Sequence, residues 1–331
     1  MSGKGRGALG EAPGVLRFVT LNLWGENGPH QRRLDLIGQE LERLAPDVVA
    51  LQEVRDVPGQ LPNQAETLAR RLGYSHAFAA ATEWGGGVEG LAIVSRFAVL
   101  DRADRRLPYA TDTEVRVVLW ALLDGPTGGV WFHKTHLSYR QHEGREREDQ
   151  VLALDEQIAA RAAGNERPQI LMGDFNTVAA SDEIRWLCGL TTLAGRRVFY
   201  QDAWETARAG EPGITWARRN PFRARMNWLR PDRRIDYIFV TAPRRDGRGT
   251  VRDARVVFDQ PDGDGVYPSD HFGVVSDVQI APDATLSDPT GAAPGNPTGA
   301  APGTPTGAAP ATSPAASLSP TSPPAPSVKK A

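Results

Sequence analysis

Residues 267–280 read YPSDHFGVVSDVQI, and this stretch places Asp270 and His271 directly before the apolar run Phe272–Ile280. A carboxylate beside an imidazole at the start of a predicted strand suits acid–base catalysis or metal binding. One Asp–His dipeptide arises often by chance. It gains weight here because other polar residues upstream also stand at the ends of apolar runs.

Those apolar runs have the length of strands, and several are rich in β-branched residues and end in Gly, Pro or polar clusters. They are Val15–Asn22, Asp47–Gln52, Leu91–Ser95, Val115–Leu123, Val130–His136, Gln169–Asp174, Ile235–Val240 and Phe272–Ile280. The segment Asp124–Gly129 predicts a hairpin, and therefore antiparallel pairing of the runs on either side of it.

Two segments show helical periodicity. Apolar residues recur from Leu34 to Leu44 and again from Val151 to Ile158, where the charged run Glu143–Asp149 begins the helix. Strands and helices mix without strict alternation. We therefore expect an α/β fold, a four-layered sandwich in which two mixed β-sheets pack face to face with helices outside.

Composition divides the chain into three parts. Residues 1–14 are Gly-rich and polar and predict a flexible N-terminus, and residues 15–281 predict one folded domain. Residues 282–331 hold 12 of the 26 prolines and an eight-residue repeat that starts at Pro289, Pro297 and Pro305. Such a segment buries too little apolar surface to offset its ordering entropy, so we expect a disordered tail.

Several classes of protein are disfavoured. No stretch reaches the roughly 18 apolar residues that a membrane span requires. The single cysteine, Cys188, excludes an internal disulfide and a cysteine-cluster metal site. The first residues lack the apolar core of a secretory signal, so we expect a cytoplasmic protein, with export left open. A net charge of −2 does not itself suggest a nucleic-acid partner, and we expect a monomer.

The polar residues at the strand ends form a set. They are Asn22, Glu53, His136, Asp174 with Asn176, Asp236, and Asp270 with His271. Any one of the acidic or amide residues alone is explained as a turn cap. So many of them, each beside an apolar strand, are better explained by strand ends that meet at one rim.

The set predicts phosphoryl transfer assisted by a hard metal ion. Carboxylate and amide oxygens suit Mg²⁺, with Mn²⁺ as a substitute, whereas Zn²⁺ would need a histidine or cysteine set that is absent. The metal would offset charge on the phosphate, a carboxylate would orient the attacking water, and a histidine would transfer a proton or donate to the phosphoryl group.

These residues also resemble a known family. The segments LNLWG, ALQEV, EGLAIVSR, THLS, LMGDFN, RRIDYIFV and SDHFGV are similar, in this order, to those of the endonuclease/exonuclease/phosphatase superfamily, which includes deoxyribonuclease I. The resemblance spans about residues 15–280. It implies a four-layered α/β sandwich and Mg²⁺-dependent hydrolysis of phosphoesters.

Roles follow from the resemblance residue by residue. It assigns Asn22, Glu53 and Asp270 to the metal, with Glu53 as the principal ligand. It assigns Asp174 and Asn176 to the nucleophile and the phosphate. Whether Asp174 or a histidine acts as the base stays open.

The remaining assignments concern the histidines and the substrate. By resemblance, His271 is the terminal catalytic histidine with Asp236 as its partner, and His136 is a second histidine oriented by Glu89. Arg116, Asn176 and Asn220 are assigned to substrate binding. Trp24 stands where abasic-site endonucleases carry an Asp, which counts against a dedicated repair enzyme.

The substrate is the least determined feature. Residues 218–255 hold 12 Arg against four Asp, a local net charge of +8, with Trp228 among them and Trp216 just before them. Such a segment suits a nucleic-acid backbone and its bases, although it also fits a solvated loop in an arginine-rich protein. We expect a nuclease-type phosphodiesterase. The alternatives are a sphingomyelinase-like or small-molecule phosphoesterase and, third, a non-catalytic binding module.

Overall fold

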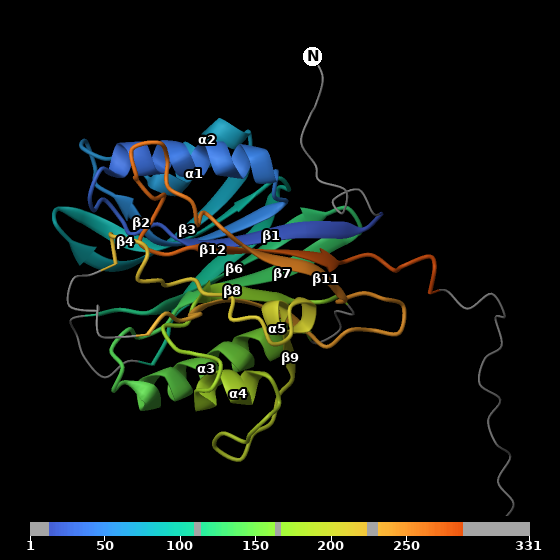
Figure 1. Ribbon diagram of the computed structural model, residues 1–331. Coiled ribbons are helices and arrows are strands. Elements are labelled where there is room, and N and C mark those ends of the chain that lie inside the picture. The colour runs from blue at the N-terminus through green and yellow to red at the C-terminus, as the bar shows by residue number, and fades with distance from the viewer. Residues whose placement is uncertain (1–12, 109–113, 163–166, 224–230, 287–331) are drawn as a thin grey trace, which may run out of the picture. The chain divides into compact units, whose positions relative to one another are not determined.

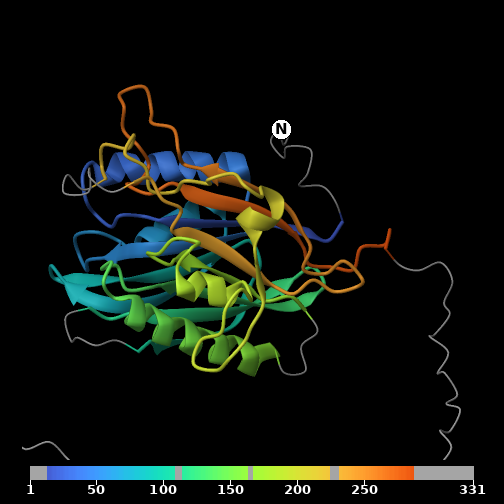
Figure 2. The same cartoon turned by 60° about the horizontal axis from the view of Figure 1, so that its bottom comes forward.

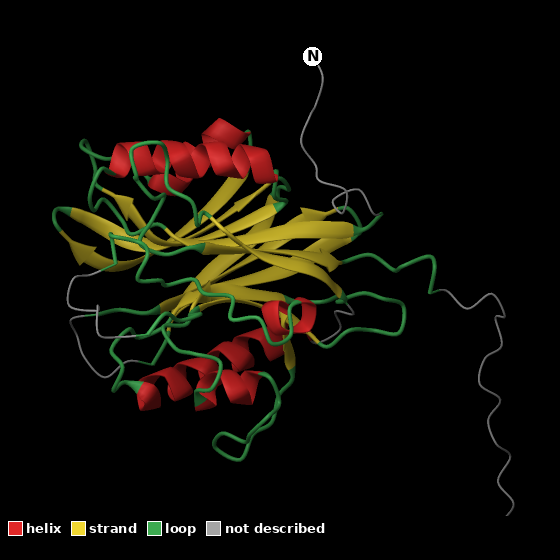
Figure 3. Cartoon of the chain, in the orientation of Figure 1, coloured by secondary structure: helices red, strands yellow, loops and turns green. Residues whose placement is uncertain are grey.

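The computed structural model describes residues 13–108, 114–162, 167–223 and 231–286. The chain divides into a compact unit over Met1–Ser287 and a second unit over Asp288–Ala331. Residues 287–331 of the predicted tail lie outside the described residues, whereas residues 282–286 are described and Asp283 pairs with Arg252. The compact unit contains two six-stranded mixed sheets with helices on their outer faces, as the sequence predicts (Figures 1 and 3).

The first sheet runs in the order β11-β12-β1-β2-β4-β3. Its strands are β11 (Val251–Val257), β12 (Gly273–Gln279), β1 (Val15–Asn22), β2 (Val48–Asp56), β4 (Gly87–Ser95) and β3 (Ser75–Trp84). Only β1 and β2 pair in parallel among the strand pairs described for this sheet.

The second sheet runs in the order β5-β6-β7-β8-β10-β9. Its strands are β5 (Val99–Arg106), β6 (Val117–Gly125), β7 (Gly128–His136), β8 (Ile170–Asp174), β10 (Asp236–Thr241) and β9 (Tyr200–Asp202). Here β7 and β8 form the parallel pair within the described part of the sheet, and their neighbours are antiparallel.

Four of the described helices complete the outer layers, namely α1 (His30–Leu44), α2 (Gln64–Leu72), α3 (Gly144–Ala162) and α4 (Asp182–Leu187). A further helix, α5 (Ala203–Ala207), packs against β10 and β11, and its Ala203 belongs to the cluster between the sheets. Helices α1 and α2 share a buried cluster with the first sheet, and α3 and α4 share one with the second. Figure 2 shows α1 (blue) and α3 (green) on opposite sides of the two sheets.

Strand alternation explains why each sheet is buried on both faces. In β1, Phe18 belongs to the cluster between the sheets, whereas its neighbour Val19 belongs to the cluster under α1 and α2. Successive side chains of a strand point to opposite faces, so a continuous apolar run feeds two cores at once. The rings of Phe18 in β1 and Phe132 in β7 are in contact across the two sheets, with their centroids 5.5 Å apart.

Several elements were not predicted. Strand β5 (VLDRADRR) is an edge strand whose residues are mostly exposed, so it lacks an apolar pattern. Gly85-Gly86-Gly87 contains the turn of the β3–β4 hairpin, where Trp84 pairs with Gly87. Gly85 and Gly86 have φ of 56° and 73°, which the tight turn requires and glycine adopts freely.

A buried ion pair fixes β1 against β12. The Arg17 guanidinium donates from Nε to Asp277 Oδ1 at 2.7 Å and from Nη2 to Oδ2 at 2.8 Å. Arg17 is 7% exposed and Asp277 2%. The two residues are register partners, and a bidentate pair of this kind holds that register.

We predict that Asp277→Ala lowers the free energy of unfolding by about 3–5 kcal/mol, because it leaves a buried guanidinium without its partner. The double variant Arg17→Met/Asp277→Leu should recover most of the loss. Urea denaturation measures both. Glu40→Ala, which removes the exposed pair with Arg43, is the control and should cost less than about 1 kcal/mol. A double variant no more stable than Asp277→Ala would contradict this role.

Candidate active site

Strand register brings three predicted residues of the second sheet into one row. His136 at the end of β7 pairs with Asp174 at the end of β8, and Asp174 pairs with Asp236 at the start of β10. Because β7 and β8 are parallel, their last residues lie at the same edge of the sheet. All three residues are buried, with at most 6% of their surface exposed.

The first sheet supplies the facing half of the site. Asn22 ends β1, Glu53 lies in β2, and Asp270 with His271 precedes β12, which is the neighbour of β1. The Asn22 amide Nδ2 donates to Glu53 Oε1 at 2.9 Å and to Asp174 Oδ2 at 3.2 Å. One amide group therefore links the ends of both sheets.

Two site residues hold backbone conformations that are unfavourable for residues with a side chain. Glu53 has φ of 50° and lies where the β2–β4 register shifts between Leu51 and Val54. Asn176 has φ of 54°, and its backbone N–H donates to Asp174 Oδ1 at 2.8 Å. Bulges and left-handed residues that re-aim side chains concentrate at functional sites.

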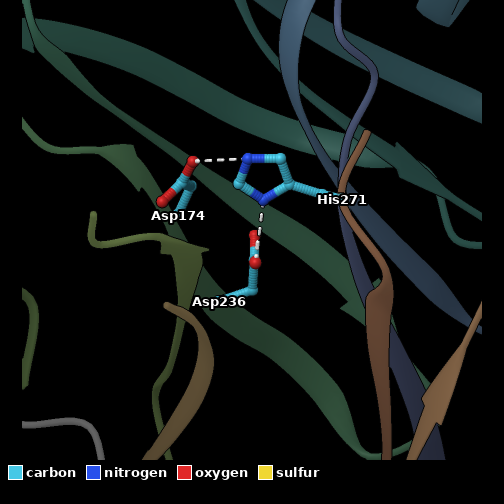
Figure 4. Close-up of side chains that lie close together, drawn as sticks. All are labelled: Asp174, Asp236 and His271. Atoms are coloured by element: carbon cyan, nitrogen blue, oxygen red, sulfur yellow. Dashed lines mark hydrogen bonds and ion pairs between the residues drawn. The ribbon is translucent and has the colours of Figure 1, made fainter. Parts of the chain in front are cut away.

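His271 lies between two carboxylates (Figure 4). Its Nδ1 is 3.0 Å from Asp236 Oδ2, and its Nε2 is 3.7 Å from Asp174 Oδ2. Burial alone would lower the pKa of His271, but Asp236, Asp174 and then Asp270 raise it well above the usual value. The imidazole is therefore held as a cation at neutral pH.

The acidic residues form a buried concentration of negative charge. Burial, followed by the nearby Glu89, raises the pKa of Glu53 to about 7. Burial and then Glu53 raise the pKa of Asp270 to about 7, although His271 opposes this. Burial and then Asp236 raise the pKa of Asp174 to about 6. Burial disfavours the charged form of a carboxyl group, and a neighbouring carboxylate disfavours it further.

This donor set fits a divalent cation. Glu53 raises the pKa of Asp270, and a cation between the two carboxylates would remove that repulsion. Their oxygens are hard ligands of the kind that Mg²⁺ and Mn²⁺ prefer. The Asn22 oxygen Oδ1 accepts from the Trp24 N–H at 2.9 Å, so Asn22 faces Glu53 with its Nδ2. A second group, Asp174, Asp236 and His271, has ligand atoms within 4.8 Å of one another. In that group His271 Nδ1 is already engaged with Asp236.

His136 differs from His271 in its charge. Burial, followed by Arg116, Lys134 and His271, lowers the pKa of His136 well below its usual value, so the ring is neutral. Its Nε2 is 3.5 Å from Asp174 Oδ2. The site therefore combines one cationic and one neutral imidazole around the same carboxylate.

A cleft of about 480 Å³ opens over these groups. From the predicted set it is lined by Glu53, Glu89, Arg116, His136, Asp174, Asn176 and His271. Four residues that were not predicted also line it, namely Thr82, Glu114, Tyr139 and Arg140. Its volume lies within the usual range of small-ligand sites, which is about 300–1,000 Å³.

The structure places two of the predicted residues in contacts other than the expected ones. Asn220 was assigned to substrate, but it is buried and its Nδ2 donates to Ser269 O at 2.7 Å. It is absent from the cleft lining and instead supports the loop that carries Asp270 and His271. Glu89 was expected to orient His136. Among the described residues no ion pair joins them, and Glu89 interacts chiefly with Arg116, Trp84 and Arg55.

Some functional positions were missed because their sequence signal is ordinary. Ser269 Oγ donates to Asn22 O at 2.6 Å, which ties the Asp270–His271 loop to β1. Thr215 Oγ1 accepts from the Asp236 N–H at 3.3 Å. Lys134 is fully buried two residues before His136. Of these three residues, only Lys134 has a signal in the sequence, because a lysine inside an apolar strand is unusual.

The arginine-rich segment 218–255 is largely paired with carboxylates. The ion pairs join Arg218 and Arg223 to Asp232, Arg219 to Asp259, Arg234 to Asp202, Arg248 to Asp246, Arg252 to Asp283, and Arg255 to Asp253. Trp216 is buried with Arg223 over its ring at 3.9 Å. Trp228 lies outside the described residues. Much of the local charge excess therefore serves the fold.

The two-sheet α/β sandwich and the polar residues at its strand ends together indicate a class of protein, the hydrolases that act on phosphoesters. The chain belongs to the Endonuclease/Exonuclease/phosphatase family, whose model matches residues 19–271. It is therefore an enzyme that hydrolyses phosphoric esters with a divalent metal. An uncharacterized protein of Caenorhabditis elegans is 23% identical over 306 residues, 79% of this chain and 90% of that protein.

Solved structures share the fold. An endonuclease/exonuclease/phosphatase from Beutenbergia cavernae is 24% identical with a TM-score of 0.60, covering 81% of this chain and 72% of that one. TDP2 from Caenorhabditis elegans is 17% identical with a TM-score of 0.62, covering 81% and 75%. Among the described helices, none combines the length and apolar character needed to cross a membrane.

We predict that Asp270→Asn raises the melting temperature in EDTA, because it removes one of the two repelling carboxylates. The pKa of Asp270 in the fold, about 7, exceeds its unfolded value. Folding of the metal-free protein thus takes up protons, and its stability falls as pH rises toward that pKa. The gap between the variant and the natural chain should therefore widen from about pH 5 to about pH 8.

Differential scanning calorimetry with EDTA and with Mg²⁺ checks this. Mg²⁺ should stabilise the natural chain more than the variant, because a ligand that binds only the folded state raises the melting temperature. A variant that melts below the natural chain in EDTA at the higher pH would contradict the charge argument.

Proposed function

We propose that this protein is a Mg²⁺-dependent phosphodiesterase of nuclease type. The observation that supports it most is the position of His271, held as a cation between Asp236 and Asp174 at the floor of the cleft. A fixed cation there matches the charge of a phosphodiester. The carboxylates Glu53 and Asp270 beside it match a divalent metal.

Glu53, Asp270 and Asn22 would hold the metal. When bound, Mg²⁺ would offset the charge on the phosphate and on the departing oxygen. The protein's own groups would do the rest. Asp236 keeps His271 oriented and charged, so that His271 donates a hydrogen bond to a phosphoryl oxygen that gains charge in the transition state.

Asp174 is the group best suited to the attacking water. Its pKa of about 6 leaves it ionised at neutral pH yet close enough to accept a proton. The water oxygen forms the new bond to phosphorus as its proton passes to Asp174. The ester P–O bond breaks, and the leaving oxygen takes a proton from a solvent water while Asp174 returns its proton to solvent.

Asn176 and His136 complete the phosphate-binding groups. Asn176 Nδ2 donates one N–H to Leu137 O at 3.0 Å, and its second N–H is available for a phosphate oxygen. His136 is neutral and adds a hydrogen bond without adding charge. Both side chains line the cleft, as does Arg116.

The family description favours nucleic acid as the substrate class. The cleft volume of about 480 Å³ also suits a small phosphodiester, which is the second candidate. We expect hydrolysis of thymidylyl-thymidine that requires Mg²⁺, is supported by Mn²⁺ and stops with EDTA. Turnover of an aryl phosphodiester without cleavage of any nucleotide substrate would favour a small phosphodiester as the substrate. Activity unaffected by EDTA would contradict the proposed metal dependence.

We predict that Asp174→Ala and His271→Ala each lower kcat at least about 10²- to 10⁴-fold, the usual contribution of a proton-transferring side chain. Circular dichroism should show an unchanged fold, since neither residue belongs to an apolar cluster. His76→Ala is the matched control, because His76 is exposed on β3. Near-normal kcat in either purified site variant would overturn the assigned roles.

A further inference from the structure

Tyr139 presents an open aromatic face inside the cleft. Its side chain lines the cleft and is 51% exposed. The Arg140 guanidinium lies over the ring at 4.8 Å from its centroid, so one face of the ring is covered. The other face is open to a ligand. A large exposed aromatic in this position contributes nothing to the apolar cores.

The loop that carries this ring is fixed to the catalytic groups. Its Leu137 O accepts from Asn176 Nδ2 at 3.0 Å, and its Ser138 N–H donates to Gln150 Oε1 at 3.1 Å. Arg140 donates from its backbone N–H and from Nη1 to the Glu143 carboxylate, at 3.2 and 2.7 Å. The ring is therefore presented on a braced loop beside the residue assigned to the phosphate.

The ring and the reactive groups share a cleft of about 480 Å³. A ligand whose phosphodiester reaches Asn176 and His271 therefore has its adjoining group beside Tyr139. A flat, polarisable ring is the group that gains most from such a surface. Stacking of a base on an aromatic side chain contributes about 1–3 kcal/mol and tolerates any base.

We propose that Tyr139, backed by Arg140, is a stacking site for one unpaired nucleobase next to the scissile phosphodiester. The substrate class is then single-stranded nucleic acid or an unpaired strand end. A base inside a duplex has both faces covered by its neighbours and offers none to the ring. This inference rests on the proposed phosphodiesterase function and names the substrate of that same site.

Three substrates test it: thymidylyl-thymidine and two analogues in which one nucleoside, either the 5′ or the 3′ one, carries no base. Tyr139→Ala should lower kcat/KM for the complete dinucleotide about 5- to 100-fold. For the analogue that lacks the stacked base, the loss should be less than about threefold. The analogue with this behaviour identifies which base stacks.

Two variants serve as controls. Tyr139→Phe keeps the ring and should retain the activity on the dinucleotide, which separates stacking from any role of the hydroxyl. Phe199→Ala removes a ring that is similarly exposed, at 55%, but does not line the cleft. This variant should leave kcat/KM unchanged for all three substrates.

The outcomes distinguish the two proposals. An equal loss on all three substrates, or no loss on any, overturns the stacking site while the phosphodiesterase function stands. A natural chain that cleaves none of the three and no aryl diester overturns the phosphodiesterase function and the stacking site with it. Preference for duplex over single-stranded oligonucleotides of the same sequence also overturns the stacking site.

Discussion

The parallel pairing of β7 with β8, in register with the antiparallel β10, is the constraint on which the site depends. It sets His136, Asp174 and Asp236 side by side at one edge of the second sheet. A shift of one residue in a strand would turn its side chain to the opposite face. The shared apolar layer between the sheets then brings the end of β1 against this row, where Asn22 Nδ2 bonds to Asp174.

The same convergence concentrates charge that a folded protein ordinarily avoids. Burial, together with repulsion from neighbouring carboxylates, raises the pKa values of Glu53 and Asp270 to about 7 and that of Asp174 to about 6. Away from the site, the buried Asp277 carboxylate is matched by Arg17 in a bidentate pair. Unmatched carboxylates at the rim and matched ones in the body indicate where a cation and an anionic substrate belong.

The two basic features of the chain differ in what they can offer a substrate. Arginines of both features have carboxylate partners, since Arg116 pairs with Glu114 and Arg140 with Glu143. The difference is position: Arg116 and Arg140 line the cleft beside the catalytic groups, and no described arginine of residues 218–255 does. Composition alone pointed to the first set, because charge density is visible in a sequence and pairing is not. The open face of Tyr139 had no sequence signal, since exposure and neighbouring side chains depend on loop packing.

The sandwich, most of its central strands and the polar residues at their ends could be predicted from the sequence, because buried strands need long apolar runs and their ends need polar groups. It did not determine edge strands such as β5, whose exposed residues carry no pattern. Two contacts came from the folded chain alone. Asn220 supports the Asp270–His271 loop, and Glu89 interacts with Arg116, Trp84 and Arg55 instead of forming an ion pair with His136. Such partners are set by the approach of segments far apart in the chain, and no local pattern encodes that distance.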